Sequence, residues 1–446
     1  MKARLWRLLS DLHDAFWLVP MALVTTAIAL ALALLELDRR ELVPEWLVAS
    51  NWLYSGGGTG ARTLLGAVAS STIGVAGTAF SITIASLSLA AGQMGPRLLT
   101  NFTRDRGNQI TLGAFLGTFC YSLMVLRAVR TEGEGTFTPH LALSVAILLA
   151  FVCVVMLVYF VGHMAARLNV DTVVELVSRD VRVAVDRLTT HELFTPPPRP
   201  IDGDPTTLLV TDPRRGYLEQ LDEEGLADWA EAHGTVLHLL VRTGDYVFPG
   251  APIALVNPAV EGVDAAIKSA TALGPSRTST ADLEYSIRQL VEVAARALSP
   301  GINDPHTAIS VIDRLGATLC DVARATLPNG VIARSGRAVL VRPAIDYDGL
   351  LDSMFHLVRQ NAAGTPAVLI RMLEILSAVA TCERCPARLG ALARHADLVQ
   401  GDGERTIATP GDVADLRRRH DAFTAARRSS DRRGRSVADP RDCLLE

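Results

Sequence analysis

Residues 63–92 read TLLGAVASSTIGVAGTAFSITIASLSLAAG, and this stretch, more than any other, decides the fold. No charged residue occurs from Thr63 to Pro96, a run of 34 residues. A hydrocarbon core about 30 Å thick is crossed by roughly 20 apolar residues in a helix, so the run predicts a transmembrane helix. At 1.5 Å per residue it would be about 50 Å long, so it either extends beyond the bilayer or ends near Gly92 and the Gly95-Pro96 pair.

Three further apolar runs accompany it. One covers residues 15–35, another lies between Arg106 and Arg127, and the last covers about 141–162. Charged side chains cost several kcal/mol each in the middle of a bilayer, so uncharged runs of this length indicate membrane spans. The first run has a basic start and could be read as a signal peptide. It is longer than a signal core, and Glu36 and Asp38 follow it, which favours an uncleaved helix.

Basic residues give the expected orientation. They precede the first run, separate the second from the third and follow the fourth: Lys2, Arg4, Arg7, Arg97, Arg104, Arg106, Arg167, Arg179 and Arg182. Lysine and arginine favour the cytoplasmic side, which predicts a cytoplasmic N-terminus. Four spans then return the C-terminal region to the cytoplasm.

The second run carries small residues on one helical face. At about 100° per residue, one narrow stripe contains Ala67, Ser70, Gly74, Gly77, Ser81, Ala85, Ser88 and Gly92. Small residues let helices approach closely in lipid, so one interpretation is helix packing. The other is a wall of a water-filled path, lined by hydroxyl groups. None of the four runs has a charged residue at its centre, which counts against a proton-coupled transporter more than against a passive pore.

The remaining chain predicts a mixed region after the membrane helices. We expect a four-helix transmembrane domain over 1–165, an amphipathic helix and proline-rich linker over 166–200, a small β-rich unit over 201–260, a helical cytoplasmic domain over 261–400, and a partly helical, largely disordered polar tail over 401–446. Residues 241–256 are similar to the half-motif of lipoyl- and biotinyl-type β-sandwiches, although the modifiable lysine is missing; a plain β-hairpin is the alternative.

A block at residues 296–308, RALSPGINDPHTA, is the most specific motif. Together with the four-helix N-terminus and the Ser/Thr-rich second run, it resembles the bacterial membrane-protein family called domain of unknown function 2254, over about residues 5 to 400. The resemblance implies a bacterial inner-membrane location. It implies no activity, substrate or catalytic residue.

The same block is the best candidate ligand site. Its polar side chains surround a corner between two expected helices: Arg296, Ser299, Asn303, Asp304, His306 and Thr307. A helix N-terminus with free N–H groups can hold an anion. The alternative is capping, in which Asp304 and Thr307 satisfy backbone donors and the other residues shape the turn.

Little points to other chemistry. Cys382 and Cys385 have CxxC spacing, but a zinc site needs about four ligands and the histidines nearby, His356 and His395, show no paired spacing. Walker, nucleotide-binding glycine, Gly-x-Ser-x-Gly and HExxH motifs are absent from the sequence, so no catalytic residue, metal or cofactor is expected and an enzyme is the least supported class. A net charge of −4 gives no reason to expect nucleic acid.

The leading hypothesis is therefore a homo-oligomeric channel or transport-like protein with a cytoplasmic regulatory domain, whose small-molecule or ion ligand is undefined. Four spans are few for a monomeric transporter, which favours an oligomer in the lipid bilayer. The alternative is a membrane-anchored sensor or scaffold whose cytoplasmic domain binds a partner or an anion.

Overall fold

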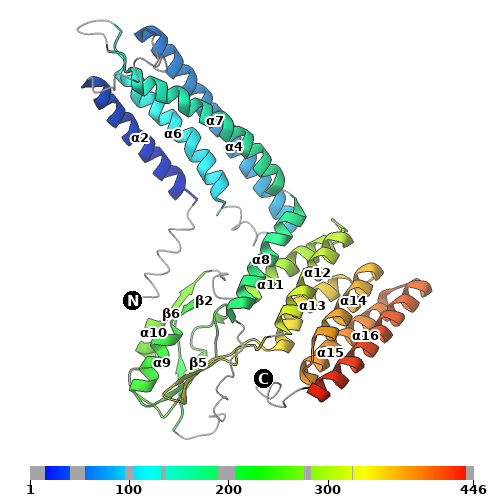
Figure 1. Cartoon of the computed structure of the whole chain (residues 1–446). Helices are drawn as coiled ribbons and strands as arrows, with labels where there is room; N and C mark the ends of the chain where they lie inside the picture. Colours follow the sequence, from blue (N-terminus) through cyan, green and yellow to red (C-terminus); the bar gives the residue numbers. More distant parts are fainter. Residues whose placement is uncertain are drawn as a thin grey trace. The chain divides into compact units, whose positions relative to one another are not determined.

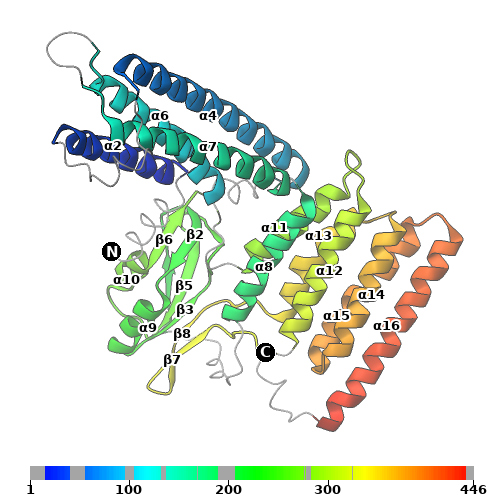
Figure 2. The ribbon, with the colours of Figure 1, turned by 45° about the horizontal axis from the view of Figure 1, so that its top comes forward.

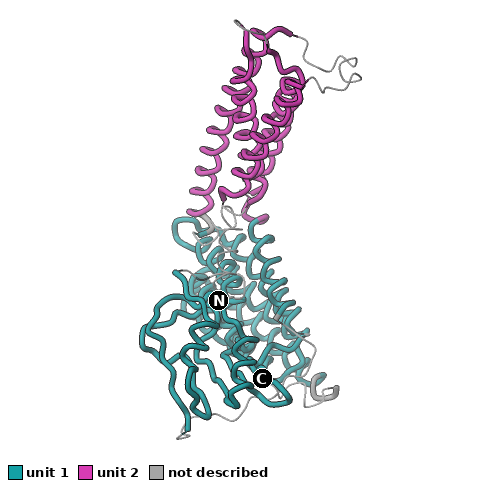
Figure 3. The backbone as a smooth tube through the Cα atoms, turned by 90° about the vertical axis from the view of Figure 1, so that its left-hand side faces the viewer, with its two compact units in different colours: residues 1–9, 93–95, 173–446 teal, residues 10–92, 96–172 magenta. Residues whose placement is uncertain are grey.

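The computed structural model describes residues 16–40, 56–95, 105–131, 137–167, 169–188, 206–275, 277, 283–323 and 325–437. These fall into two compact units, coloured in Figure 3: a membrane unit within residues 10–92 and 96–172, and a C-terminal unit within residues 93–95 and 173–446.

The membrane unit contains four helices that are long and apolar enough to cross a bilayer, as the sequence predicts. They are α2 (Leu18–Arg39), α4 (Gly58–Met94), α6 (Arg106–Ala128) and α7 (His140–Arg167), labelled in Figure 1. Helix α4 ends at Met94, directly before Gly95, whose φ of 113° is open to glycine but costly for other residues. The long helix therefore ends next to the Gly95-Pro96 pair, which is one of the two ends that the sequence allows.

Apolar side chains from all four helices form the core of this unit. One cluster joins Leu35 of α2, Leu65 of α4, Tyr121 and Val125 of α6, and Leu143 of α7. Ala76 and Ala79 bring α4 to two further clusters, with Phe115 and Cys153 in one and with Phe160 and Met164 in the other. Helix α4 thus joins the unit largely through small side chains.

Helix α8 (Val170–Leu188) is the amphipathic helix that the sequence predicts after the last span. Five of its valines, at helical spacing, are buried: Val173, Val174, Val177, Val181 and Val185. Arg314 of helix α12 (Pro305–Val322) pairs with Glu175 on α8, 3.2 Å away. The buried stripe and this ion pair hold α8 within the C-terminal unit.

Two sheets follow, seen beside helices α9 (Glu223–Ala232) and α10 (Val263–Ala270) in Figure 2. The strands are β1 (Leu208–Thr211), β2 (Gly216–Leu221), β3 (Val236–Leu239), β4 (Tyr246–Val247), β5 (Pro252–Asn257), β6 (Thr271–Gly274), β7 (Val331–Arg334) and β8 (Arg337–Val341). The larger sheet has the order β1-β5-β3-β8-β7, with β3 and β8 parallel, and the smaller has the order β4-β2-β6.

This arrangement differs from the expected β-rich unit in two ways. Strands β6, β7 and β8 lie beyond residue 260, and β8 returns from the expected helical domain to pair with β3. The segment 241–256 is not a plain hairpin either. Strand β4 pairs with β2 in the smaller sheet, whereas β5 pairs with β1 and β3 in the larger one.

The rest of the unit is helical: α11 (Leu283–Ala297), α12, α13 (Tyr347–Asn361), α14 (Pro366–Cys382), α15 (Pro386–Thr406) and α16 (Pro410–Val437). Helix α16 corrects the expected largely disordered tail, of which residues 438–446 lie outside the described residues. Leu416 and Phe423, seven residues apart, are buried on one face of α16, which packs against α14 and α15. That apolar pair anchors a helix on which Arg417, Arg418, Arg419, Arg427, Arg428, Arg432 and Arg433 are exposed.

Candidate functional site

The small-residue stripe of α4 faces away from the helix's own unit. The buried side of α4 is formed by Leu65, Ala69, Thr72, Ala76 and Ala79. Ser70, Gly74, Gly77, Ser81 and Ser88 are all exposed on the opposite side. A Cβ atom added at Gly74 or Gly77 would meet no heavy atom of the described residues within 4 Å. The described residues therefore leave the stripe as an uncovered groove.

Three hydroxyl groups on the exposed side of α4 are hydrogen-bonded within the helix. The Ser81 hydroxyl donates to the carbonyl of Gly77 at 3.0 Å, and that of Thr78 to the carbonyl of Gly74 at 3.1 Å. Ser70 donates to Ala67 in the same way. Such back-bonding satisfies a hydroxyl without water. The stripe can therefore face either another helix or an aqueous path.

Bulky apolar side chains border the groove. Ile73, Phe80 and Ile84 are exposed along one edge of the stripe, with fractions of 40% to 49%. A groove of glycine and serine with a raised apolar edge has the shape that a second helix fills at close range.

A buried carboxylate joins α6 to α7 at one end of the membrane unit. Asp105 is the N-cap of α6, and its Oδ1 accepts a hydrogen bond from the Gly107 N–H at 2.9 Å. Its Oδ2 lies 2.6 Å from His163 Nε2 and 3.3 Å from Arg167 Nε, both on α7. Tyr159 stacks on the His163 ring. This cluster was not predicted from the sequence, although Asp105 directly precedes an apolar run, which is the usual capping position.

The corner at residues 296–307 has its polar groups engaged in capping. Asp304 is the N-cap of α12, and its carboxylate accepts from the backbone N–H groups of His306 and Thr307 and from the Thr307 hydroxyl. These hydrogen bonds, the one from the Thr307 hydroxyl foremost, lower the pKa of Asp304 below its ordinary value. The Asp304 carboxylate thus already accepts hydrogen bonds from the backbone N–H groups that a bound anion would need.

The other residues of that corner shape the turn. Asn303 has a φ of 50°, and the Ser299 hydroxyl donates to the carbonyl of Arg296 at 2.6 Å. Arg296 itself lies 3.5 Å from Glu292, one turn earlier on α11. The geometry favours the capping interpretation over anion binding.

Glu284 near the start of α11 is surrounded by arginines. Arg242 and Arg277 lie 2.8 and 2.7 Å from its two carboxylate oxygens, and Arg288 lies 3.4 Å away. Burial raises the pKa of Glu284, but the hydrogen bond from Arg277 and the arginine charges outweigh burial and leave the pKa below its ordinary value. Arg242 follows strand β3, so this cluster ties the sheet region to the helices.

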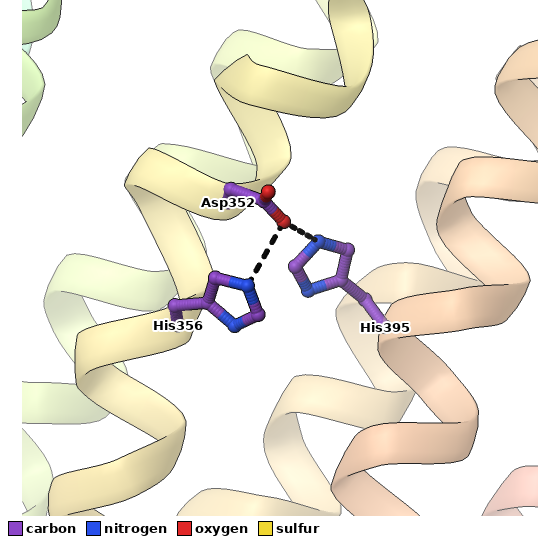
Figure 4. A group of neighbouring side chains, drawn as sticks. All are labelled: Asp352, His356 and His395. Carbon is purple, nitrogen blue, oxygen red and sulfur yellow. Dashed lines mark hydrogen bonds and ion pairs between the residues drawn. The ribbon is translucent and has the colours of Figure 1, made fainter.

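Asp352, His356 and His395 form a cluster that the sequence analysis did not predict (Figure 4). Asp352 Oδ1 lies 3.1 Å from Nε2 of His356, one turn later on α13, and 3.0 Å from Nε2 of His395 on α15. The spacing of Asp352 and His356 could have been read from the sequence, because residues four apart share a helix face. Their pairing with His395 depends on how α13 and α15 pack.

The CxxC pair stays outside that cluster. Cys382 is a free, half-buried cysteine at the end of α14. Asp352, His356 and His395 form the single group of potential metal ligands found among the described residues, and it includes neither cysteine.

The protein is an integral membrane protein with four spanning helices. This class follows from the length and hydropathy of the four helices and from the exposed apolar side chains of α2, α4 and α7. The family model of a predicted membrane protein (DUF2254) matches residues 13–378, and the chain belongs to that family.

Curated relatives support the same assignment. The chain is 31% identical over 422 residues to the uncharacterized proteins MT1328 and Rv1290c of Mycobacterium tuberculosis and Mb1321c of Mycobacterium bovis. The match covers 91% of this chain and 80% of each relative. No solved structure matches the chain.

Proposed function

We propose that the protein is a homo-oligomeric channel or transport-like protein of the bacterial inner membrane, in which the outward face of α4 packs against other copies around a central path. The observation that carries the proposal is the uncovered stripe of Ser70, Gly74, Gly77, Ser81 and Ser88. The C-terminal unit would then regulate or assemble the membrane helices from the cytoplasm.

Comparison of α4 with α7 supports this assignment of faces. The exposed side of α7 carries large apolar groups, among them Leu148, Phe151 and Val155 at 60% to 67% exposure. An 18-residue window of α7 has a mean hydropathy of 3.1, and the corresponding window of α4 has a mean hydropathy of 1.7. Lipid tails solvate a surface of large apolar side chains well, whereas small-residue faces in membranes are typical of helix–helix contacts. Helix α7 therefore suits lipid and α4 suits protein or water.

The orientation belongs to the same proposal. The basic residues around the spans favour N- and C-termini in the cytoplasm. A reporter that is active only in the periplasm, fused after Arg167, should be inactive. Strong activity of that fusion would reverse the orientation.

The packing role is tested by a pair of glycine variants. Gly77 and Gly162 are exposed glycines of α4 and α7, and a Cβ added at either one would meet no described heavy atom within 4 Å. Wild type in mild detergent should have a mass that is a multiple of 47.8 kDa. Gly77→Leu should shift it to the monomer, because a large side chain blocks close approach, while Gly162→Leu should leave it unchanged. Equal masses for all three proteins would contradict the role of α4.

The path is tested by thiol labelling. Cysteines placed at Ser70, Ser81 and Ser88, in a background without the native cysteines, should react with a small charged thiol reagent if the stripe faces water. A cysteine at Val155 on α7 serves as the lipid-facing control and should be protected. Protection at all three serine positions, with an intact oligomer, would leave α4 as a packing helix and favour the membrane-anchored sensor or scaffold.

A further inference from the structure

We propose that Asp352, His356 and His395 bind a divalent transition metal ion of the zinc class. The proposal concerns the helical part of the C-terminal unit and does not depend on oligomerisation or transport by the membrane helices. Its starting point is geometric: two imidazoles and one carboxylate, contributed by α13 and α15, converge on one point (Figure 4).

The distances suit a small tetrahedral ion. Zinc binds histidine nitrogen and carboxylate oxygen at about 2.0–2.2 Å, which places neighbouring ligand atoms of a tetrahedron roughly 3.3 Å apart. Asp352 Oδ1 lies 3.1 Å from His356 Nε2 and 3.0 Å from His395 Nε2. One ligand atom from each residue lies within 4.8 Å of the other two. The two distances from Asp352 to the histidine nitrogens are therefore already close to the tetrahedral spacing.

The two histidines differ in burial. The side chain of His395 is fully buried between the helices. His356 is 37% exposed and gives the site access to solvent.

The cluster is poorly satisfied as a set of hydrogen bonds alone. Both imidazoles point Nε2 at the same oxygen of Asp352, which also accepts from Arg394 at 2.7 Å. An ion held by the two Nε2 atoms and Asp352 would replace these shared contacts on one oxygen.

The local charge also suits a divalent cation. Arg394 lies 2.7 Å from Asp352 and 2.9 Å from Asp348, so one guanidinium faces two carboxylates. With neutral imidazoles the group carries a net charge of −1, which a divalent ion changes to +1. Arg394 keeps Asp348 as a partner when Asp352 turns towards the metal.

Three protein ligands leave a fourth position open. Two histidines and one carboxylate with an open position form a donor set that takes zinc and, in other proteins, iron(II). Because the ligands come from α13 and α15, an ion at this point would cross-link two helices that are separated in the sequence by helix α14.

The test is metal binding by the full-length protein in detergent. After treatment with a chelator and its removal, the wild type should bind one zinc ion per chain by competition with a chromophoric chelator. Cobalt(II) should give the visible absorption of a tetrahedral site, and zinc should raise the melting temperature. His356→Gln and Asp352→Asn should lower zinc affinity at least tenfold and abolish the cobalt spectrum.

The variants are chosen so that folding and binding can be separated. His395→Gln alters a fully buried side chain, whereas His356 and Asp352 are 37% and 40% exposed, so their variants should keep the melting temperature of the metal-free wild type. His420→Gln, at a histidine on α16 that pairs with Asp397, and Cys382→Ser should bind zinc as the wild type does. Absence of stoichiometric binding in the wild type, or unchanged binding in His356→Gln, would reduce the group to a hydrogen-bonded cluster and overturn the proposal.

Discussion

Asp105 is expected to be the residue on which the packing of α6 against α7 depends most. Its carboxylate is 3% exposed and has two separate functions: it caps the N-terminus of α6 and it pairs with His163 and Arg167 of α7. Asp105→Ala removes both functions. Asp105→Asn removes the negative charge and keeps a side chain that caps helices as well as aspartate does.

The two substitutions should differ by the value of the cap. Loss of an N-cap costs about 1 kcal/mol. Loss of a charged hydrogen-bond partner costs about 2–3 kcal/mol, towards the lower end because Arg167 is 25% exposed and can turn to solvent. We expect about 2 kcal/mol for Asp105→Asn and about 3 kcal/mol for Asp105→Ala. At roughly 3 °C per kcal/mol for a unit of this size, the melting temperature should fall by about 6 and 9 °C.

Cys153 provides a local assay for this prediction. It lies on α7, is 5% exposed, and its Sγ is 3.3 Å from the Thr118 hydroxyl of α6. In a background where it is the sole cysteine, a thiol-reactive dye should label it when α6 and α7 separate on heating. Asp171→Asn, at an exposed position, is the control. Labelling curves for Asp105→Ala and Asp105→Asn that coincide with wild type would refute the reasoning.

Three other predictions test the C-terminal unit. Gly316→Ala should destabilise it by about 1–3 kcal/mol in chemical denaturation, because the new Cβ overlaps the Ile375 methyl, whereas Gly390→Ala, in open space on α15, should gain up to about 1 kcal/mol. The pKa of Glu284 is lower in the folded protein than its ordinary 4.5, so its ionised form stabilises the fold above that pH and the contribution is lost as the pH falls through the folded value. Glu284→Gln should therefore lower stability by about 3 kcal/mol at pH 7 and flatten the acid limb of thermal melts; an unchanged limb would reject this. Phe423→Ala should cost about 3 kcal/mol and release α16 to trypsin at its arginines, and a digestion pattern identical to wild type would contradict the anchoring role.

The membrane helices were predictable because their signal is local. A span must satisfy its backbone within one helix and carry an apolar surface, so each of the four appears as a continuous run in the sequence. The structure confirms the four spans, with ends that extend beyond the predicted runs at Gly58 and Arg167. The sequence did not indicate whether the α4 stripe faces the other three helices or the outside of the unit. A row of small residues predicts close packing but does not identify the partner.

The C-terminal unit was predictable where neighbours in sequence are neighbours in space. The valines of α8 and the Asp304 cap follow from helical spacing and capping rules. Strand β8 pairs with β3 across about a hundred residues, and no local pattern records such a pairing. The arginine-rich sequence of α16 indicated disorder because two buried side chains, Leu416 and Phe423, are a weak signal among many charges.

Helices α2, α6 and α7 form a frame that polar contacts fix at both ends of α7. At its start, the Asp38 carboxylate of α2 accepts hydrogen bonds from the Leu141 and Ala142 N–H groups, at 3.1 and 3.0 Å. At its end, Asp105 holds His163 and Arg167. Helix α4 joins this frame through Leu65 and a line of alanines, which bury little apolar area per residue. A helix that is held weakly on one side and open along a small-residue groove on the other gains most from a partner on that groove, and its attachment to the frame would then depend on assembly.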